Sequence, residues 1–134
     1  MPGIAFLGAN AVKRFELPNG GVFHIGNAWG EGGVLRLDYA RYTRFLEHLH
    51  ALDVTQPANT PEKLAHWAQV ELNLAQGTAR QIDTPLAAVE SPSFDTRRTG
   101  LRTETTVLMQ RRGSAGMLAV QGVDTELALR GERT

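Results

Sequence analysis

The sequence predicts an all-β chain with one short connecting helix, and three observations lead to this fold class. The 134 residues include 14 glycines and 6 prolines, which separate short apolar runs as turns separate strands. Residues 34–39 alternate between two faces with the period of a half-buried strand. Residues 42–52 alone carry apolar side chains at convincing helical spacing.

The N-terminal part predicts two strands, each followed by a turn. Residues 12–17 alternate loosely between apolar and polar side chains and end at the turn sequence Pro18–Gly21. The short β-prone run Val22–Ile25 follows. After the small residues 26–28, the segment Gly30–Gly33 predicts a second, flexible turn.

A third strand and the helix follow directly. In residues 34–39 one face carries Val34, Arg36 and Asp38, and the other, which we expect to be the core face, carries Leu35, Leu37 and Tyr39. One side of the predicted helix, residues 42–52, carries Tyr42, Phe45, Leu46, Leu49 and Leu52. The prolines at positions 57 and 61 indicate a connector after it.

The C-terminal half predicts a hairpin and two further strands. Residues 64–74 fit either a continued helix or a strand, and we favour the strand because Val70, Leu72 and Leu74 alternate with polar residues. The turn Gln76–Thr78 then leads into a returning strand. The remaining expectations are the returning strand at 79–82, a loop at 85–92, strands at 103–109 and 117–123, and a turn from Asp124.

Composition excludes several classes of partner and site. Lys and Arg together number 14, as do Asp and Glu, so we expect no nucleic-acid partner held by phosphate neutralisation. The absence of cysteine excludes disulfides, thiolate metal sites and iron–sulfur clusters. No basic segment precedes the first apolar run, and no run of about 18 apolar residues occurs, so we expect a cytoplasmic protein without a membrane span.

The four histidines are the candidate metal ligands. On the predicted helix, His48 and His50 point to different faces and do not easily share one metal. On a strand they would share a face, as in a small cupin-like metalloprotein. We expect His66 to be a half-exposed residue at the start of a strand. His24 lies in an apolar run, where a histidine is ordinarily a satisfied core residue.

The surroundings of His24 carry a family resemblance. Residues Phe23–Trp29, followed by Glu31–Gly32 and a strand ending at Leu37–Asp38, resemble the FHxxNAxE signature of the carotenoid oxygenases, which include the lignostilbene dioxygenases. Three further landmarks of that family follow in order: Asp38–Tyr42 for a D-Y-x-R-Y-like stretch, His66–Trp67 with Leu72 and Gly77–Thr78 for a hairpin, and Glu90–Gly100 for an E-F-P-x-x-D-x-R-x-x-G segment. The resemblance covers residues 12–100 and extends through residue 124.

This resemblance implies a fold, a metal and two site residues. The family fold is a seven-bladed β-propeller with Fe(II) on its axis, bound by four histidines, so the chain would form about two to three blades of a partial propeller. By that similarity, His24 is an iron ligand and Glu90 is the carboxylate that pairs with it. Such a carboxylate fixes the tautomer of a ligating imidazole and makes it more basic.

The same residues also allow readings without a metal. Glu90 alone would cap a backbone amide or pair with Arg97 or Arg98, and those arginines form a solvated pair that pins their loop. Trp29 either fills the core or lines a substrate passage. Two departures from the family pattern, Gly30 in place of a glutamate and Ser91 in place of the aromatic of E-F-P, concern packing and substrate fit.

The resemblance implies a non-haem Fe(II) dioxygenase that uses O₂ to cleave one C=C bond of a carotenoid, apocarotenoid or stilbene into two carbonyl products. Because only His24 occupies a ligand motif, we expect residues 1–134 to be a single fragment that lacks the other three ligands and is inactive alone. The alternatives are a non-catalytic β-rich propeller fragment and the cupin-like metalloprotein. Open blades leave unpaired strand edges, so we also expect self-association.

Overall fold

The computed structural model describes the chain except residues 1–2, 8–11, 45–64, 113–116 and 125–134. Within the described residues it contains nine strands and one short 3₁₀ helix. The strands are β1 (Gly3–Leu7), β2 (Val12–Glu16), β3 (Gly21–Glu31), β4 (Val34–Tyr42), β5 (His66–Asn73), β6 (Thr78–Ala87), β7 (Val89–Ser93), β8 (Thr105–Arg112) and β9 (Met117–Asp124), and the 3₁₀ helix is η2 (Thr96–Arg98).

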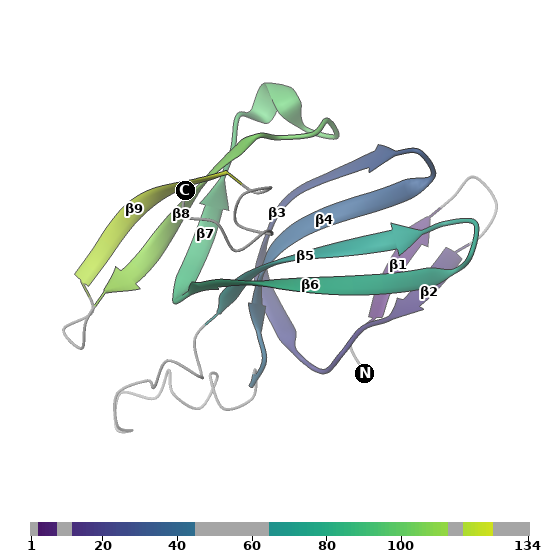
Figure 1. The fold of residues 1–134 in the computed structure, drawn as a ribbon, viewed down its shortest axis with the longest axis horizontal. Helices are drawn as coiled ribbons and strands as arrows, with labels where there is room; N and C mark the ends of the chain where they lie inside the picture. Colours follow the sequence, from purple (N-terminus) through teal and green to yellow (C-terminus); the bar gives the residue numbers. More distant parts are fainter. Residues whose placement is uncertain (1–2, 8–11, 45–64, 113–116, 125–134) are drawn as a thin grey trace.

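The strands form two antiparallel sheets and a separate hairpin (Figure 1). One sheet has the order β3–β4–β5–β6, the other has the order β7–β8–β9, and β1 pairs with β2. Within each sheet and within the hairpin, every strand therefore pairs with the next one in sequence, which is the connectivity of a propeller blade. The described residues contain no helix long and apolar enough to span a membrane.

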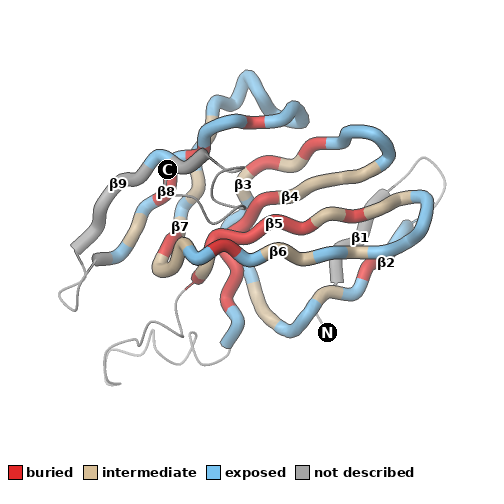
Figure 2. Tube along the Cα trace, in the orientation of Figure 1, coloured by how far each residue is buried: buried red, intermediate tan, exposed pale blue. Residues whose placement is uncertain are grey.

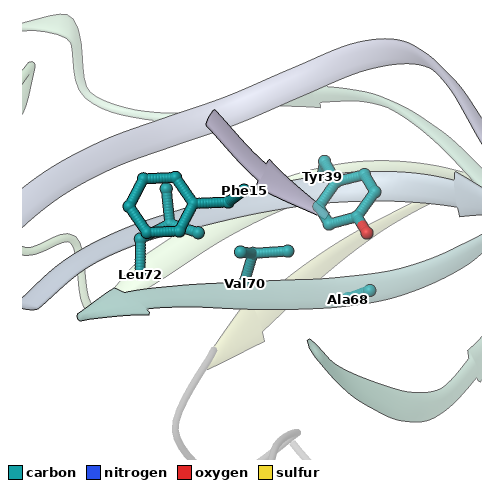
Figure 3. Packing of buried hydrophobic residues seen from close by; sticks show 5 residues of the cluster. All are labelled: Phe15, Tyr39, Ala68, Val70 and Leu72. Atoms are coloured by element: carbon teal, nitrogen blue, oxygen red, sulfur yellow. The ribbon is translucent and has the colours of Figure 1, made fainter. Parts of the chain in front are cut away.

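Buried residues gather on the central strands β4 and β5 (Figure 2), and they pack in clusters on both faces of the sheet. On one face Phe15 of β2 packs in a cluster with Tyr39, Ala68, Val70 and Leu72 (Figure 3). On the opposite face Trp67, which is fully buried, packs with Val89 of β7 and Leu108 of β8. The four-stranded sheet is thus the middle layer between the hairpin and the second sheet.

Gly26 of β3 allows the close approach that this packing needs. A Cβ atom at this position would lie 2.9 Å from Cη2 of Trp67 and 3.3 Å from the carbonyl oxygen of Asp38. Both distances are shorter than ordinary van der Waals contact, so a larger residue would push β3 away from the core.

Because β4 is covered on both faces, one expectation about the predicted strand 34–39 is wrong: the face opposite to its core face is not exposed throughout. Leu35 and Tyr39 do lie on the face toward Phe15, but Asp38 on the opposite face is not at the surface. It is fully buried and accepts a 2.8 Å hydrogen bond from Nε2 of Gln69. Burial raises the pKa of Asp38 to about 7, because the loss of solvation outweighs the effect of that hydrogen bond.

Two boundaries in the N-terminal half differ from the sequence expectation. β3 does not stop at Ile25 but continues to Glu31. Its pairing with β4 is irregular between Val22 and Ala28, but from Ala28 to Glu31 it is regular again, so the strand continues. The turn is reduced to Gly32 and Gly33, both at positive φ. β4 extends to Tyr42, so the predicted helix does not begin there, and its residues 45–52, with His48 and His50, lie outside the described residues.

The predicted loop at 85–92 is also wrong, since β6 and β7 occupy most of it. Pro85 and Pro92 each lie at a register shift of a strand at the edge of its sheet, where a missing N–H donor is tolerated. The hairpin of β5 and β6 and the strand β9 are confirmed. β8 begins two residues later than predicted, and β1 is a strand that the sequence analysis did not anticipate.

Asp38 makes the stability of this fold depend on pH. Its pKa is raised from 3.8 to about 7, so the folded chain keeps a proton that the unfolded chain has already lost in this range. Stability should therefore fall as the pH rises from about 4 to about 7, by a few kcal/mol in total. Urea unfolding at several pH values should show this decline, and Asp38→Asn should remove it.

Asp95→Asn is the matched control, because Asp95 is exposed and bonds only within its own loop. This variant should keep the loss of stability that the parent protein shows between about pH 4 and pH 7. Equal slopes of stability against pH for the parent protein and Asp38→Asn between about pH 4 and pH 7 would contradict the assignment.

Candidate functional site

His24 lies on β3, an edge strand of the four-stranded sheet, in the stretch where pairing with β4 is irregular. Such bulges turn side chains away from the direction that regular pairing would give them. The side chain of His24 is 55% exposed, and its neighbours Phe23 and Ile25 are exposed as well. His24 is therefore an accessible imidazole in an apolar surface, not a buried core histidine.

Glu90 of β7 lies directly beside His24. Its Oε2 atom is 2.6 Å from Nδ1 of His24 and accepts a 3.0 Å hydrogen bond from the backbone N–H of Ser91. The two residues come from different sheets, whose strands β3 and β7 are in contact. The structure thus brings together the two residues that the family resemblance pairs.

The other oxygen of Glu90 has a partner that the sequence analysis missed. The hydroxyl of Tyr42, the last residue of β4, donates a hydrogen bond to Oε1 of Glu90. Tyr42 is buried, and burial together with the neighbouring Glu90 raises its pKa above the ordinary tyrosine value. The period-2 pattern of β4, continued through Ala40 to residue 42, would have placed Tyr42 on the same face as Asp38.

Asn27 holds this part of β3 to the segment between β7 and β8. It is almost fully buried, and its side-chain N–H groups donate to three oxygens: the carbonyls of Arg98 and Leu101 and the hydroxyl of Thr103. Its Oδ1 atom accepts from the backbone N–H groups of Ala28 and Gly100. Every polar atom of this side chain is satisfied, so Asn27 is a clamp between the two sheets.

The two arginines of the segment after β7 have partners of their own. Arg97 forms an ion pair with Asp95, and Arg98 donates to the carbonyl of Arg102. Neither contact involves Glu90, which is a strand residue and not a loop residue. Arg97 is strongly exposed, as expected for a solvated pair that pins its loop.

The structure also places Trp29 and His66, the two other positions discussed in the sequence analysis. Trp29 is buried at 6% exposure and its backbone bridges to Gly100, so it is a core residue. His66 is the half-exposed first residue of β5. Within the described part of the chain, no group of three or more His, Cys, Asp or Glu side chains comes together to hold a metal.

His24 and Glu90 fit one position of a metal site. The contact with Glu90 uses Nδ1 of His24, which leaves Nε2 of this exposed ring available to a metal ion. A carboxylate on the second nitrogen of a ligating histidine is the usual outer partner in metal sites. A single imidazole does not make a complete site, so a metal held here would need further ligands besides His24.

Comparison with known proteins gives one family match and several structural matches. The family model of the retinal pigment epithelial membrane protein matches residues 6–128. No curated protein matches significantly. The solved structures include a cobalt-substituted apocarotenoid oxygenase from Synechocystis, at 19% identity and a TM-score of 0.73, with 94% of this chain and 27% of that chain covered.

A chimera of the same apocarotenoid oxygenase with RPE65 matches with the same identity, coverage and TM-score. The chain thus spans about a quarter of the length of these structures. At this identity the likeness concerns the fold, and it confirms the predicted fold class: the chain has the fold of part of a seven-bladed β-propeller.

The Asn27 clamp gives a direct prediction for stability. Asn27→Ala should lower the free energy of unfolding by about 3 kcal/mol, because it removes the hydrogen bonds that a buried amide makes to three oxygens and two backbone N–H groups. Asn27→Asp should be at least as damaging, since it would place an oxygen against the three acceptor oxygens. Urea denaturation followed by circular dichroism measures both losses.

Asn73→Ala serves as the control. Asn73 also accepts two backbone N–H bonds, from Ala75 and Gln76, but in the exposed turn of the β5–β6 hairpin. We expect a loss of about 1 kcal/mol or less there. Equal losses for Asn27→Ala and Asn73→Ala would show that the clamp does not hold the sheets together.

Proposed function

The chain belongs to the carotenoid oxygenase family, that of the retinal pigment epithelial membrane protein, and from this membership we propose that it supplies part of the propeller and one iron ligand of an Fe(II) dioxygenase. The proposed reaction is cleavage of one C=C bond of a carotenoid, apocarotenoid or stilbene by O₂ to two carbonyl products. A cytoplasmic location is part of the same proposal.

One observation carries the proposal: the 2.6 Å contact between Nδ1 of His24 and Oε2 of Glu90. The two residues stand far apart in the sequence and come from separate sheets, yet they meet where the family resemblance pairs them. A chance surface pair would not be expected at these two motif positions. The open Nε2 side of an exposed ring is what a shared metal site needs from this chain.

The roles of the two residues follow from their chemistry. Glu90 accepts a hydrogen bond from the N–H group at Nδ1 of a neutral imidazole, and this leaves the lone pair of Nε2 for the metal. The carboxylate also supplies negative charge near a site whose ligands are neutral. When bound, Fe(II) would supply the O₂ binding and redox chemistry of the cleavage.

The chain alone should not be an active oxygenase. It spans about a quarter of the length of the structures that it matches, and His24 is the histidine in a ligand motif. One imidazole holds Fe(II) weakly, so we propose that the 134-residue chain neither retains stoichiometric iron nor cleaves a polyene. No observation favours the cupin-like alternative, because His48 and His50 lie outside the described residues.

Metal titration tests the ligand role of His24. Purified protein incubated with Fe(II) and then dialysed should contain well below one iron per chain. In an NMR titration, Co(II) should broaden the resonances around Nε2 of His24 weakly and reversibly. His24→Gln should abolish this local broadening, because the variant has no ring nitrogen.

His66→Gln is the matched control, since His66 is half-exposed and has no carboxylate partner among its described hydrogen bonds. It should leave the broadening at His24 intact. Co(II) broadening that is unchanged in His24→Gln would overturn the ligand assignment. One tight iron per chain would overturn the expectation of an incomplete site.

The open edges and apolar surface of the sheets support self-association of the isolated chain. β3 is an edge strand and exposes Val22, Phe23 and Ile25, while β8 exposes Val107 and Met109. An exposed apolar edge strand is a template for pairing with another chain. We propose that this surface brings copies of the chain together when nothing else covers it.

Light scattering after gel filtration tests this association. The parent chain should elute as concentration-dependent oligomers, and Ile25→Lys should shift it toward the monomer, because a charged residue on an edge strand opposes pairing. Leu101→Lys is the control, since Leu101 is equally exposed but lies outside the strands. A sharply folded monomer of the parent chain at all concentrations would contradict the proposal.

A further inference from the structure

We propose that Tyr42 is a positioning residue that holds the Glu90 carboxylate on Nδ1 of His24. The inference rests on the proposed function, because it concerns the preparation of His24 as a metal ligand. It assigns a role to the last residue of the D-Y-x-R-Y-like stretch, for which the sequence analysis gave no function.

The hydrogen bonds on Glu90 define the geometry. The Tyr42 hydroxyl donates to Oε1, while His24 and the backbone N–H of Ser91 occupy Oε2. Both oxygens of the carboxylate therefore have partners, so rotation about the last side-chain bond would break at least one hydrogen bond. With only the Oε2 contacts, the carboxylate would be free to tilt away from the imidazole plane.

Tyr42 itself is held firmly. The residue is 3% exposed and packs in a cluster with Ala40 and Ala65. The ring of Phe23 meets the Tyr42 ring edge to face, at 5.4 Å between centroids and an interplanar angle of 83°. Phe23 is also the residue before His24, so one aromatic contact links the tyrosine to the strand that carries the ligand.

Three strands thus converge on one carboxylate. Tyr42 comes from β4, His24 from β3 and Glu90 from β7. The chain of contacts runs from a buried hydroxyl, through the carboxylate, to an exposed imidazole. The expected chemical effect is a single His24 tautomer, with the proton on Nδ1 and a free lone pair on Nε2.

The test is the tautomer of His24 without any metal, read from the nitrogen chemical shifts of the ¹⁵N-labelled full chain. The parent protein should show His24 protonated at Nδ1. Tyr42→Phe, which removes one oxygen and keeps the aromatic contact, should give a mixture of tautomers. The dissociation constant for Co(II) at His24 should rise by up to about tenfold.

Tyr39→Phe is the matched control. Tyr39 lies on the same strand, is also buried, and donates its hydroxyl to Oε1 of Gln81 on the opposite face. Removal of the Tyr39 hydroxyl should leave the nitrogen chemical shifts of His24 unchanged. An unaltered Nδ1-protonated His24 in folded Tyr42→Phe would overturn the proposal, as would an equal change in Tyr39→Phe.

Glu90→Gln provides a second variant if Tyr42→Phe does not fold. An amide at this position cannot accept from both His24 and Tyr42 through two oxygens, so the tautomer should again become mixed. A retained single Nδ1-protonated tautomer in Glu90→Gln would overturn the proposal. The tautomer of His24 without metal tests the role of Tyr42, whereas Co(II) binding to the parent protein tests the proposed function. Failure of the Tyr42 proposal can therefore be distinguished from failure of the proposed function.

Discussion

Trp67 lies where the two sheets meet, and the packing around its indole ring holds them together. Val89 and Leu108 cover it from the second sheet, and Gly26 leaves room for the ring beside β3. A buried tryptophan removes a large apolar area from water, so this contact outweighs any single polar bond between the sheets. Displacing the ring would separate the strands that carry the candidate site.

The polar contacts between the sheets depend on that apolar packing. His24 and Asn27 come from one sheet, whereas Glu90 and the segment after β7 belong to the other. Hydrogen bonds of this kind require atoms to be placed within a few tenths of an ångström, which only a close-packed interior can maintain. Apolar packing therefore sets the distance between the sheets, and the polar groups fix their register.

The sequence predicted the parts of the structure that local patterns encode. The β5–β6 hairpin follows from alternation and a glycine turn, and the pairing of His24 with Glu90 was expected from two motifs of one family. Local patterns failed where tertiary packing decided the outcome. Asp38 looked like a surface residue because only one covering layer was expected, whereas a second sheet buries its face.

Other differences have the same origin in contacts between distant segments. Tyr42 fits the spacing of a helix with the apolar residues after it, but its backbone pairs with Gly21 of β3, which makes it the last residue of a strand. Pro85 and Pro92 normally mark loops, but they are tolerated here at irregular edge positions. The bonds of Asn27 join it to residues more than 70 positions away, which no local pattern can show.

The hydrogen bonds of Asn27 also limit how related sequences can vary. Its amide nitrogen meets three oxygens, and its amide oxygen meets two backbone N–H groups. Aspartate has the wrong polarity for the three oxygens, serine is too short, and glutamine is one methylene too long. A homologue that replaces Asn27 would need a different path for residues 98–103, so these two segments should covary as one unit.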